Sequence, residues 1–378
     1  MEFYSINPDE NNHDEKKVKF FLTPQDFILP EEITADNIKR ITVCASFTLW
    51  EKKSSFEMEK SGSQWILEKS YEETEAPGNG GFPEFNFLLD YQAGQEKTFC
   101  LTAKTPLSEK SLSAGLQACR EVFGYNFLIL LPEEKAFLPQ LKKSEVILDR
   151  VLKLSDYDLK NPCDIARISN VRKVPATEKL WRGYHPYIKS RPQFESEKTR
   201  IKLVNKALKK NGIKSIITLC GDEKPDRAKK EKISRYVKKI QKKKNQLFVD
   251  TSYETVYFRS GSSEWKDTVK KIADFIISHP SPFYIHCRLG SDRTGTMSSI
   301  LACICGAKWD EIVRDYEKTS NAGFGEFRSP RLLEYSWKKL LGFSPSECSN
   351  LQKALCDYLT AGKILTEDEI SAVRKKLI

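Results

Sequence analysis

The stretch PFYIHCRLGSDRTGTMSSILACICG occupies residues 282–306 and has the pattern of a buried strand, a tight loop and a buried helix. The apolar run Phe283–Ile285 predicts the strand, and the run Met297–Cys305 has the length and composition of a buried helix. The loop between them begins at Cys287 and ends at Arg293. Such a joint turns successive backbone N–H groups into one concavity and adds the positive end of a helix dipole. We therefore expect an anion site of a size that suits a phosphate-like dianion.

The side chains of this loop fit chemistry on a phosphate ester. The N–H groups, the helix N-terminus and Arg293 would stabilise the thiolate form of Cys287, and the thiolate is the nucleophile. The planar guanidinium of Arg293 can hold two phosphate oxygens. Gly290 permits the backbone turn and a close approach of the ligand. Thr294 can donate a hydrogen bond to the thiolate, and we interpret His286 as a ring that orients the loop rather than as a proton carrier.

The spacing His286-Cys287-(five residues)-Arg293-Thr294 resembles the signature loop of the protein tyrosine phosphatase superfamily. An isolated buried cysteine is ordinarily inert, but here five residue types stand at set spacing between a strand and a helix. Other segments are similar to atypical, bacterial-type tyrosine and dual-specificity phosphatases, namely 169–174, 180–183 with Pro186, 208–219 and 315–321. The resemblance covers about residues 165–345.

This resemblance implies a cysteine-dependent phosphatase that hydrolyses phosphate monoesters through a phosphocysteine intermediate, without a cofactor or a metal ion. Cys287 and Arg293 are the implied catalytic pair, and His286 supports them. The residues implied to contact the phosphorylated substrate are Arg288, Leu289, Gly290, Ser291 and Thr294 of the loop, together with Arg182 on the pocket wall.

The leaving oxygen needs a proton, for which a neutral Asp is the usual donor. Many family members carry this Asp on a mobile loop, but the corresponding segment 253–260 has none. Asp292 directly precedes Arg293, and this form of the loop resembles bacterial lipid/tyrosine phosphatases and myotubularin-like enzymes, in which the loop Asp is taken as the acid. We favour Asp292, with Asp250 and Asp222 as more distant candidates; alternatively, Asp292 only braces the loop.

The substrate class is less determined than the chemistry. The sequence favours phosphotyrosine or dual-specificity activity, with inositol polyphosphates or phosphoinositides as the alternative. Lipid-active relatives commonly carry Lys where Ser291 stands, which argues against a lipid-specialised site, although Arg288 could supply a charge from the other side of the mouth. A non-catalytic phospho-binding module is a further alternative. Redox sensing is another, with Cys220 as a conceivable resolving partner of Cys287.

Upstream of the loop, period-two patterns predict short strands at 41–50, 54–60, 64–69, 84–89, 97–103 and 125–131, after an irregular lead-in over 1–40. We predict four parts: an all-β immunoglobulin-like sandwich of early-set type over 1–132, a linking helix over 133–160, a phosphatase domain over 161–345 and a C-terminal helical extension over 346–378.

The predicted phosphatase domain alternates strands and helices, which is typical of an α/β fold with a mostly parallel central sheet flanked by helices. The strand-like segments are 178–182, 213–220, 247–250, 254–258 and 282–287. The helical segments are 199–211, 225–242, 263–278, 293–306, 308–318, 328–341, 346–360 and 367–377.

The charge is unevenly distributed along the 378 residues. Residues 1–150 hold 17 Lys/Arg against 25 Asp/Glu, a net charge of −8, and residues 151–378 hold 45 against 27, a net charge of +18. Between 200 and 244 there are 17 cations and four acids. This excess suits inositol phosphates, acidic peptides or an anionic lipid surface, although a solvated helix face is the commoner outcome. We expect no nucleic acid partner.

Two tryptophans of the predicted sandwich, Trp50 and Trp65, could stack on sugar rings, because residues 47–90 loosely resemble glycogen-binding domains; a core role is the commoner outcome. The ten cysteines are dilute, and the N-terminus lacks an apolar leader pattern. No apolar run reaches the ~18 residues that a membrane helix needs. We therefore expect a cytoplasmic protein.

Overall fold

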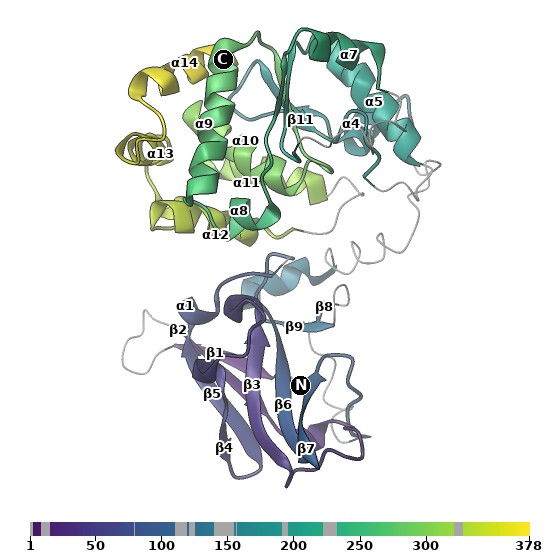
Figure 1. The fold of residues 1–378 in the computed structure, drawn as a ribbon, viewed down its shortest axis with the longest axis vertical. Helices are drawn as coiled ribbons and strands as arrows, with labels where there is room; N and C mark the ends of the chain where they lie inside the picture. Colours follow the sequence, from purple (N-terminus) through teal and green to yellow (C-terminus); the bar gives the residue numbers. More distant parts are fainter. Residues whose placement is uncertain are drawn as a thin grey trace. The chain divides into compact units, whose positions relative to one another are not determined.

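The computed structural model (Figure 1) describes residues 3–8, 16–78, 80–109, 119–120, 125–139, 155, 157–190, 196–221, 233–320 and 328–378. The chain forms two compact units, residues 1–145 and 146–378, and each unit has its own hydrophobic core. Within the described ranges, no helix is both long enough and apolar enough to cross a bilayer.

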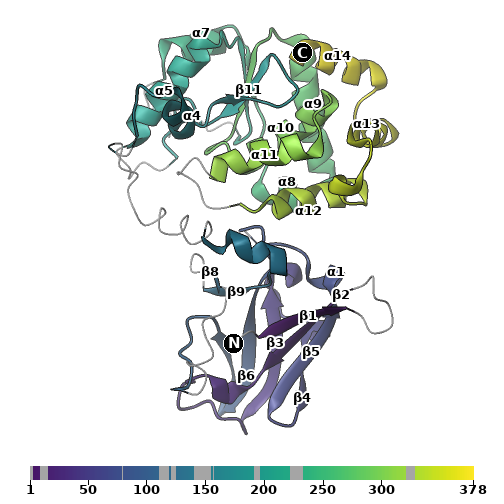
Figure 2. The ribbon, with the colours of Figure 1, turned by 180° about the vertical axis from the view of Figure 1, so that it is seen from behind.

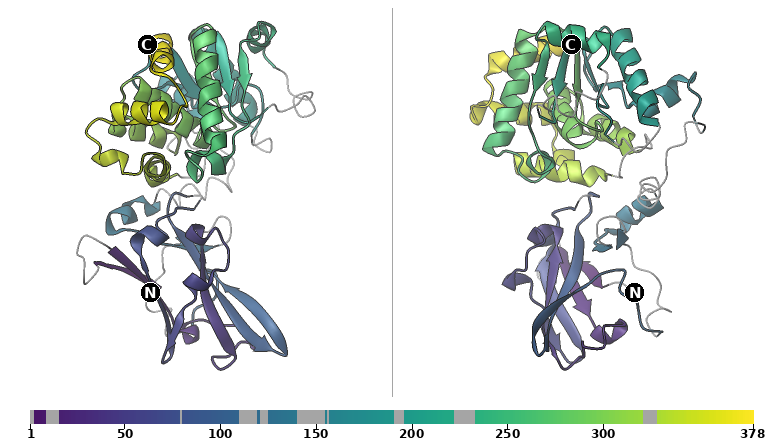
Figure 3. Two further views of the ribbon diagram at one scale, coloured as in Figure 1. Left: turned by 60° about the vertical axis from the view of Figure 1, so that its left-hand side comes forward. Right: turned by 45° about the vertical axis from the view of Figure 1, so that its right-hand side comes forward.

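Two antiparallel sheets build the N-terminal unit (Figure 3). The first sheet has, in spatial order, β1 (Tyr4–Pro8), β2 (Lys16–Leu22), β5 (Gln64–Ser70) and β4 (Glu59–Ser61). The second has β3 (Ile38–Ala45), β6 (Glu84–Ala93), β9 (Asn126–Leu128) and β8 (Cys119–Arg120), with β7 (Gln95–Leu101) also paired to β6. Phe20 of the first sheet lies 5.2 Å, ring to ring, from Phe85 of the second, so the sheets share one apolar core.

Several boundaries in this unit differ from the sequence predictions. The lead-in predicted over 1–40 contains strands β1 and β2, and the alternately buried side chains of Lys16–Leu22 have the period of two that marks a strand. The strand predicted over 41–50 ends at Ala45, because Thr48 Oγ1 accepts a hydrogen bond from the Ala45 N–H (3.0 Å) and a 3-10 turn follows. The strand predicted over 54–60 begins as another 3-10 turn, Ser54–Phe56, and only its last two residues belong to a strand, β4.

The two tryptophans considered for sugar stacking have different surroundings. Trp65 is 6% exposed and belongs to the core, so its ring is not available to a sugar. Trp50 is 44% exposed and follows Leu49 in a turn where both residues have positive φ. The carbohydrate hypothesis therefore loses one of its two rings.

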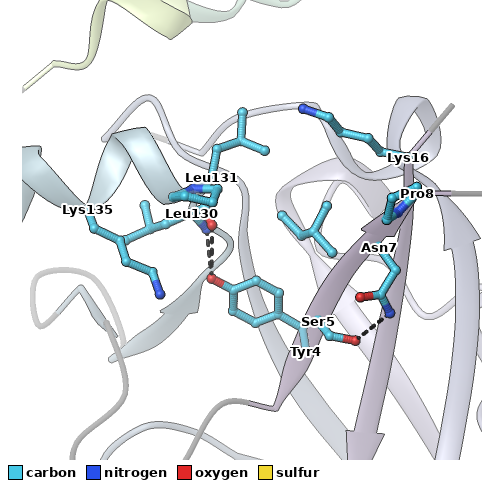
Figure 4. A pocket seen from close by; sticks show the side chains of 10 residues that line it. Tyr4, Ser5, Asn7, Pro8, Lys16, Leu130, Leu131 and Lys135 are labelled. Atoms are coloured by element: carbon cyan, nitrogen blue, oxygen red, sulfur yellow. Dashed lines mark hydrogen bonds between the residues drawn. The ribbon is translucent and has the colours of Figure 1, made fainter. Parts of the chain in front are cut away.

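A pocket of about 450 Å³ lies within the N-terminal unit, between β1 and residues 130–135 (Figure 4). The Tyr4 hydroxyl closes one side of it by accepting a hydrogen bond from the Leu130 N–H (2.9 Å). Lys16 and Lys135 also line it, so the pocket has a mixed polar and apolar wall.

The linking helix predicted over 133–160 is described only in part. The structure has a 3-10 helix, η4 (Pro132–Phe137), and then α4 (Pro162–Ser169), whose N-cap is Asn161. Residues 140–154 and 156 lie outside the described residues.

The sheet of the C-terminal unit runs, in spatial order, β10 (Arg172–Lys173), β11 (Leu180–Gly183), β14 (Phe283–His286), β12 (Ser215–Thr218) and β13 (Gln246–Phe248) (Figure 2). β11, β14, β12 and β13 are parallel, and β10 is antiparallel to β11. Gly183 and Thr218 both lie opposite His286. The segments that follow these strands therefore meet at one edge of the sheet, where ligands bind in open α/β sheets.

Alternate side chains of β14 enter two different cores. Tyr284 packs with α5 (Ser196–Lys210) and α7 (Arg235–Lys242) on one face of the sheet. Phe283 and Ile285 pack on the other face, in a core that includes α9 (Ser263–Ser278), α10 (Asp292–Ile304), α11 (Trp309–Ser320) and α12 (Pro330–Leu341). Helices thus cover both faces of the sheet (Figures 1 and 2).

The strand predicted over 254–258 is wrong, since this segment forms the short helix α8 (Tyr253–Tyr257). Its aromatic and β-branched residues are typical of strands. The Ser252 hydroxyl decides otherwise, because it accepts a hydrogen bond from the Thr255 N–H (3.0 Å) and so caps a helix.

Residues 346–378 do not form a separate extension. The helices α13 (Leu351–Ala361) and α14 (Glu367–Leu377) contribute Leu355, Leu359 and Val373 to the core beneath the sheet. The carbonyl of Leu377 also accepts hydrogen bonds from two N–H groups that directly precede β11. These helices are therefore part of the unit that carries the loop.

Leu355→Ala should lower the free energy of unfolding of the C-terminal unit by about 2–5 kcal/mol, because it leaves a cavity at a fully buried position. Urea unfolding of the full chain, followed by circular dichroism, measures this change. Lys353→Ala on the exposed side of the same helix is the matched control and should leave the transition in place. Equal midpoints for the two variants would contradict the shared core.

Candidate active site

The loop Cys287–Ser291 joins the carboxyl end of β14 to the first turn of α10, which begins at Asp292. Cys287 is 3% exposed, whereas the side chain of Arg288 is exposed to solvent. The thiol therefore stands at the buried end of the loop and Arg288 at its outer rim.

The first carbonyl groups of the loop are bound by two histidine residues. Nδ1 of His286 donates to the carbonyl of Cys287 (2.9 Å). The backbone N–H of His185, which follows β11, donates to the carbonyl of Arg288 (3.1 Å).

The next carbonyl groups are bound by side chains from β11 and the segment before it. Nδ2 of Asn170 donates to the carbonyl of Leu289 (3.1 Å), and Nη2 of Arg182 donates to that of Gly290 (2.8 Å). The carbonyl of Ser291 accepts from the Gly295 N–H, inside α10. All five carbonyl groups of the loop are thus occupied.

These contacts fix the direction of the amide groups. In a trans peptide the carbonyl and the following N–H point in opposite directions, so carbonyls held by the protein turn the N–H groups the other way. Among the described residues, none accepts a hydrogen bond from the N–H groups of 288–293. The loop therefore offers a set of unpaired donors beside Cys287 and the N-terminus of α10, which is the arrangement that binds an oxyanion.

Only glycine fits at position 290, because the backbone of β11 lies very close to it. Its φ is +82°, and a Cβ atom there would lie 2.3 Å from the carbonyl oxygen of Gly183. The loop pattern had instead predicted a close approach of the ligand at Gly290. The structure shows that β11 takes this space, and no side chain fits at position 290.

Arg182 does not line the pocket wall as expected, but is 1% exposed and braces the loop. Besides Gly290, its guanidinium binds Asp315 through Nη1 (2.7 Å). Arg172 binds the other oxygen of Asp315 (2.6 Å). Burial raises the pKa of the Asp315 carboxyl, but the charges of Arg182 and Arg172 outweigh burial and lower it overall. Burial, followed by repulsion from Arg182, lowers the pKa of Arg172 to about 10.

His286 is buried and uncharged at neutral pH. Its pKa is lowered to about 4, chiefly by burial; the hydrogen bond to the Cys287 carbonyl raises the pKa, and the charge of Arg293 lowers it. Because Nδ1 donates to the loop, Nε2 is the acceptor for the Thr218 hydroxyl (3.0 Å). His185 packs against this ring at 4.5 Å, and burial, with the nearby charges, holds its pKa well below the usual range.

Asp292 stands in the first turn of α10 and is engaged on one oxygen. Its Oδ1 accepts from Arg328 Nε (2.8 Å) and from the Tyr257 hydroxyl (3.3 Å). The Tyr257 hydroxyl also lies 2.6 Å from that of Tyr316. Burial, and then the neighbouring hydroxyl and carboxylate, raise the pKa of Tyr257 well above its usual value, so it remains a hydrogen-bond donor.

Asp250 is brought close to the loop by the end of β13. It is exposed, and it has no ion pair or hydrogen bond among the described residues. The next residue, Thr251, accepts a hydrogen bond from Arg293 Nη1 through its carbonyl (3.2 Å). Asp222, the other distant candidate, lies outside the described residues.

The remaining predicted residues occupy different depths. Thr294 is fully buried, and its Oγ1 has no hydrogen-bond partner among the described residues. Ser291 is also buried, and Leu289 is half-buried. Nη2 of the exposed Arg288 donates to the carbonyl of Ser190 (3.3 Å). Cys220 lies two residues after the end of β12. The N–H of Leu219, just before it, donates to the carbonyl of His286 (2.8 Å).

Several residues at this site were not predicted from the sequence, among them Asn170, Arg172, His185, Tyr257, Asp315 and Arg328. Asn170, Arg172 and Asp315 stand inside segments that resemble the family, and His185 stands just before Pro186, so their positions were available as a signal. Tyr257 lay in a segment predicted as a strand, and Arg328 carries no pattern that points to Asp292. Among the described residues, no group of three or more His, Cys, Asp or Glu side chains is arranged to hold a metal ion.

The low pKa of His286 predicts loss of stability in acid. The unfolded chain binds a proton near pH 6.5 and the folded chain only near pH 4, so stability should fall by about 3 kcal/mol as pH drops through this window. Urea unfolding at a series of pH values measures the slope. His286→Asn should be less stable at pH 7 and should show a smaller fall; parallel curves for the two proteins would contradict the assignment.

A search of curated proteins found no match. Among solved structures, the core catalytic domain of the PP-IP phosphatase SIW14 from S. cerevisiae, in complex with citrate, is similar at 14% sequence identity. The similarity covers 52% of this chain and 94% of that chain, with a TM-score of 0.29, which is too low to support an argument.

A family model described as the tyrosine phosphatase family matches residues 151–378. This range contains the loop, its supporting residues and the helices α13 and α14, and it is more than half of the chain. The phosphatase family predicted from the loop is therefore confirmed, and the chain belongs to the tyrosine phosphatase family.

Proposed function

We propose that the C-terminal unit hydrolyses phosphate monoesters through a phosphocysteine on Cys287. We propose further that it is a protein-tyrosine phosphatase or a dual-specificity phosphatase, which acts on phosphotyrosine and also on phosphoserine or phosphothreonine in proteins. The observation that carries this proposal is the loop whose carbonyl groups are all occupied, while the N–H groups of 288–293 have no acceptor in the part of the chain that the structure describes. Such a loop suits the oxygens of a phosphoryl group better than any uncharged ligand.

In the first step the Cys287 thiolate attacks phosphorus, the S–P bond forms and the ester P–O bond breaks. The N–H groups of 288–293 and the Arg293 guanidinium hold the three equatorial oxygens. In the second step water attacks phosphorus, the S–P bond breaks and the thiolate is restored. The unpaired Thr294 hydroxyl supports this step, because a hydrogen bond to the thiolate stabilises it as a leaving group.

Two carboxyl groups compete to protonate the leaving oxygen. Asp292 directly follows the loop and precedes Arg293, but its Oδ1 must release Arg328 before that oxygen can act. Asp250 is exposed and has no side-chain partner among the described residues, and it precedes the residue that holds Arg293. We retain Asp292 as the acid and Asp250 as the second candidate.

Inositol polyphosphates or phosphoinositides are the second candidate substrates. The observation in their favour is the exposed guanidinium of Arg288, which hydrogen-bonds Ser190 at the rim and carries no carboxylate partner among the described residues. A second phosphate could bind there, whereas a lone phosphotyrosine has no use for this charge.

Cys287→Ser should lower turnover of a small aryl phosphate, measured with a chelator present, by at least about a thousandfold. The wild-type rate on a phosphotyrosine peptide, inositol hexakisphosphate and phosphoinositide vesicles should be highest on the peptide. Substantial activity in the Cys287→Ser protein would sink the mechanism. A preference for the inositol compounds that fades with salt would select the second substrate class, and binding without turnover would indicate a non-catalytic module.

The acid can be identified with two aryl phosphates that differ only in the quality of the leaving group. Asp292→Asn should reduce kcat on the poor leaving group by about 100-fold or more, and should affect the good leaving group far less. Asp250→Asn is the matched comparison, and Arg328→Gln tests the bracing role. If only Asp250→Asn lowers kcat more on the poor leaving group than on the good one, Asp250 is the general acid. If Asp292→Asn and Arg328→Gln lower kcat equally on both aryl phosphates, Asp292 only braces the loop.

A further inference from the structure

The helices α5 and α7 lie side by side on one face of the sheet (Figures 1 and 3). Val204 and Leu208 of α5 meet Val237 and Ile240 of α7 in a common core. Both helices therefore present their opposite sides to solvent as one two-helix surface.

This surface consists of cations. The exposed positively charged residues, here called the α5/α7 surface, are Lys198, Lys202, Lys206, Lys209 and Lys210 of α5, Lys214 between α5 and β12, Arg235, Lys238, Lys239 and Lys242 of α7, and Lys243 and Lys244 after α7. The ranges 198–221 and 233–249 contain no Asp or Glu. Residues 222–232 lie outside the described residues, but their four acids and five cations cannot cancel this charge.

The cations of this surface are unpaired among the described residues, whereas α9, α11 and α13 each carry at least one cation that is paired with an acid. No member of the α5/α7 surface has an ion pair or a side-chain hydrogen bond among the described residues. Elsewhere in the same unit, exposed cations stand four residues from an acid and pair with it, as in Lys270–Asp274, Lys353–Asp357 and Asp310–Arg314.

An unpaired stripe of this kind carries an energetic penalty. Lys198, Lys202, Lys206 and Lys210 are each four residues apart, so like charges are neighbours along one side of α5. A solvated helix needs no such arrangement, and the paired helices α9 and α13 show the alternative. Negative charge from a partner would convert this repulsion into attraction.

The composition of the surface favours a lipid headgroup layer over a nucleic acid. Eleven of its twelve cations are Lys, a hydrated point charge without the planar fork that reads bases and grips single phosphates. The α5/α7 surface contains no exposed aromatic side chain on which a base could stack, since Tyr236 is half-buried and donates to the Ile213 carbonyl. Its charges spread over two neighbouring helices rather than along one ridge.

We propose that the α5/α7 surface docks the phosphatase unit on an anionic phospholipid bilayer. Clusters of Lys near such a bilayer gain attraction from each charge, and no apolar insertion is required. This inference concerns binding only. It does not depend on the substrate or on the activity of Cys287, so its failure would leave the proposed function untouched.

The test is sedimentation of the full chain with vesicles of phosphatidylcholine alone and of three parts phosphatidylcholine to one part phosphatidylserine. The chain should bind only the mixed vesicles, and added salt should release it. The variant Lys206→Gln/Lys239→Gln/Lys242→Gln should bind them on the order of 100-fold more weakly. Thermal unfolding checks that this variant remains folded.

The matched control is Lys271→Gln/Arg314→Gln/Lys353→Gln, which removes the same charge from paired, exposed positions of the same unit. It should bind the mixed vesicles as the wild type does. An equal loss in both variants would overturn the proposal, because net charge alone would then explain binding. Wild-type binding to a DNA duplex but not to the mixed vesicles would also overturn it and assign the surface to a nucleic acid.

Discussion

The hydrogen bond from the buried Arg182 guanidinium to the Gly290 carbonyl supports the centre of the loop, and the rest of the site depends on it. A charged group can be buried only when it is paired, and Asp315 supplies the partner through its contacts with Arg182 and Arg172. Together these groups tie α11, β10 and β11 to the loop. The N–H groups that would bind phosphate are therefore aimed by an ion-pair network that touches no substrate.

Packing reinforces this arrangement from two sides. Gly290 leaves no room for a side chain against the Gly183 carbonyl, so β11 and the loop fit in one way only. His286 and His185 pack edge to face beside the loop as uncharged rings, because burial disfavours their charged forms. The cations that remain near Cys287 are consequently arginines, whose charge does not vary with pH in the physiological range.

The two sides of the C-terminal unit differ in how their charges are compensated. The supporting network behind the loop is buried and closely paired, whereas Arg288 at the rim and the α5/α7 surface are exposed and lack carboxylate partners in the described ranges. The helices α9, α13 and α14, on the opposite face of the sheet, are held by apolar packing, by ion pairs along α9 and α13, and by the Lys270–Glu369 pair between α9 and α14. Within the described ranges, the twelve cations of the α5/α7 surface thus stand together without a carboxylate partner, where an anion could bind.

The sequence by itself determined the chemistry of the loop, because the spacing of Cys287, Gly290 and Arg293 between an apolar strand and an apolar helix is a local pattern. It also determined most helices and four parallel strands, whose periods are local as well. It misjudged residues 253–257 and the end of the strand at Ala45, where a single side-chain cap outweighed composition. Only the tertiary structure decided that Arg182 braces the loop, that Asp292 meets Arg328, and that α13 and α14 join the core. Each of these contacts joins residues at least 36 positions apart, and no local pattern encodes which distant groups come together.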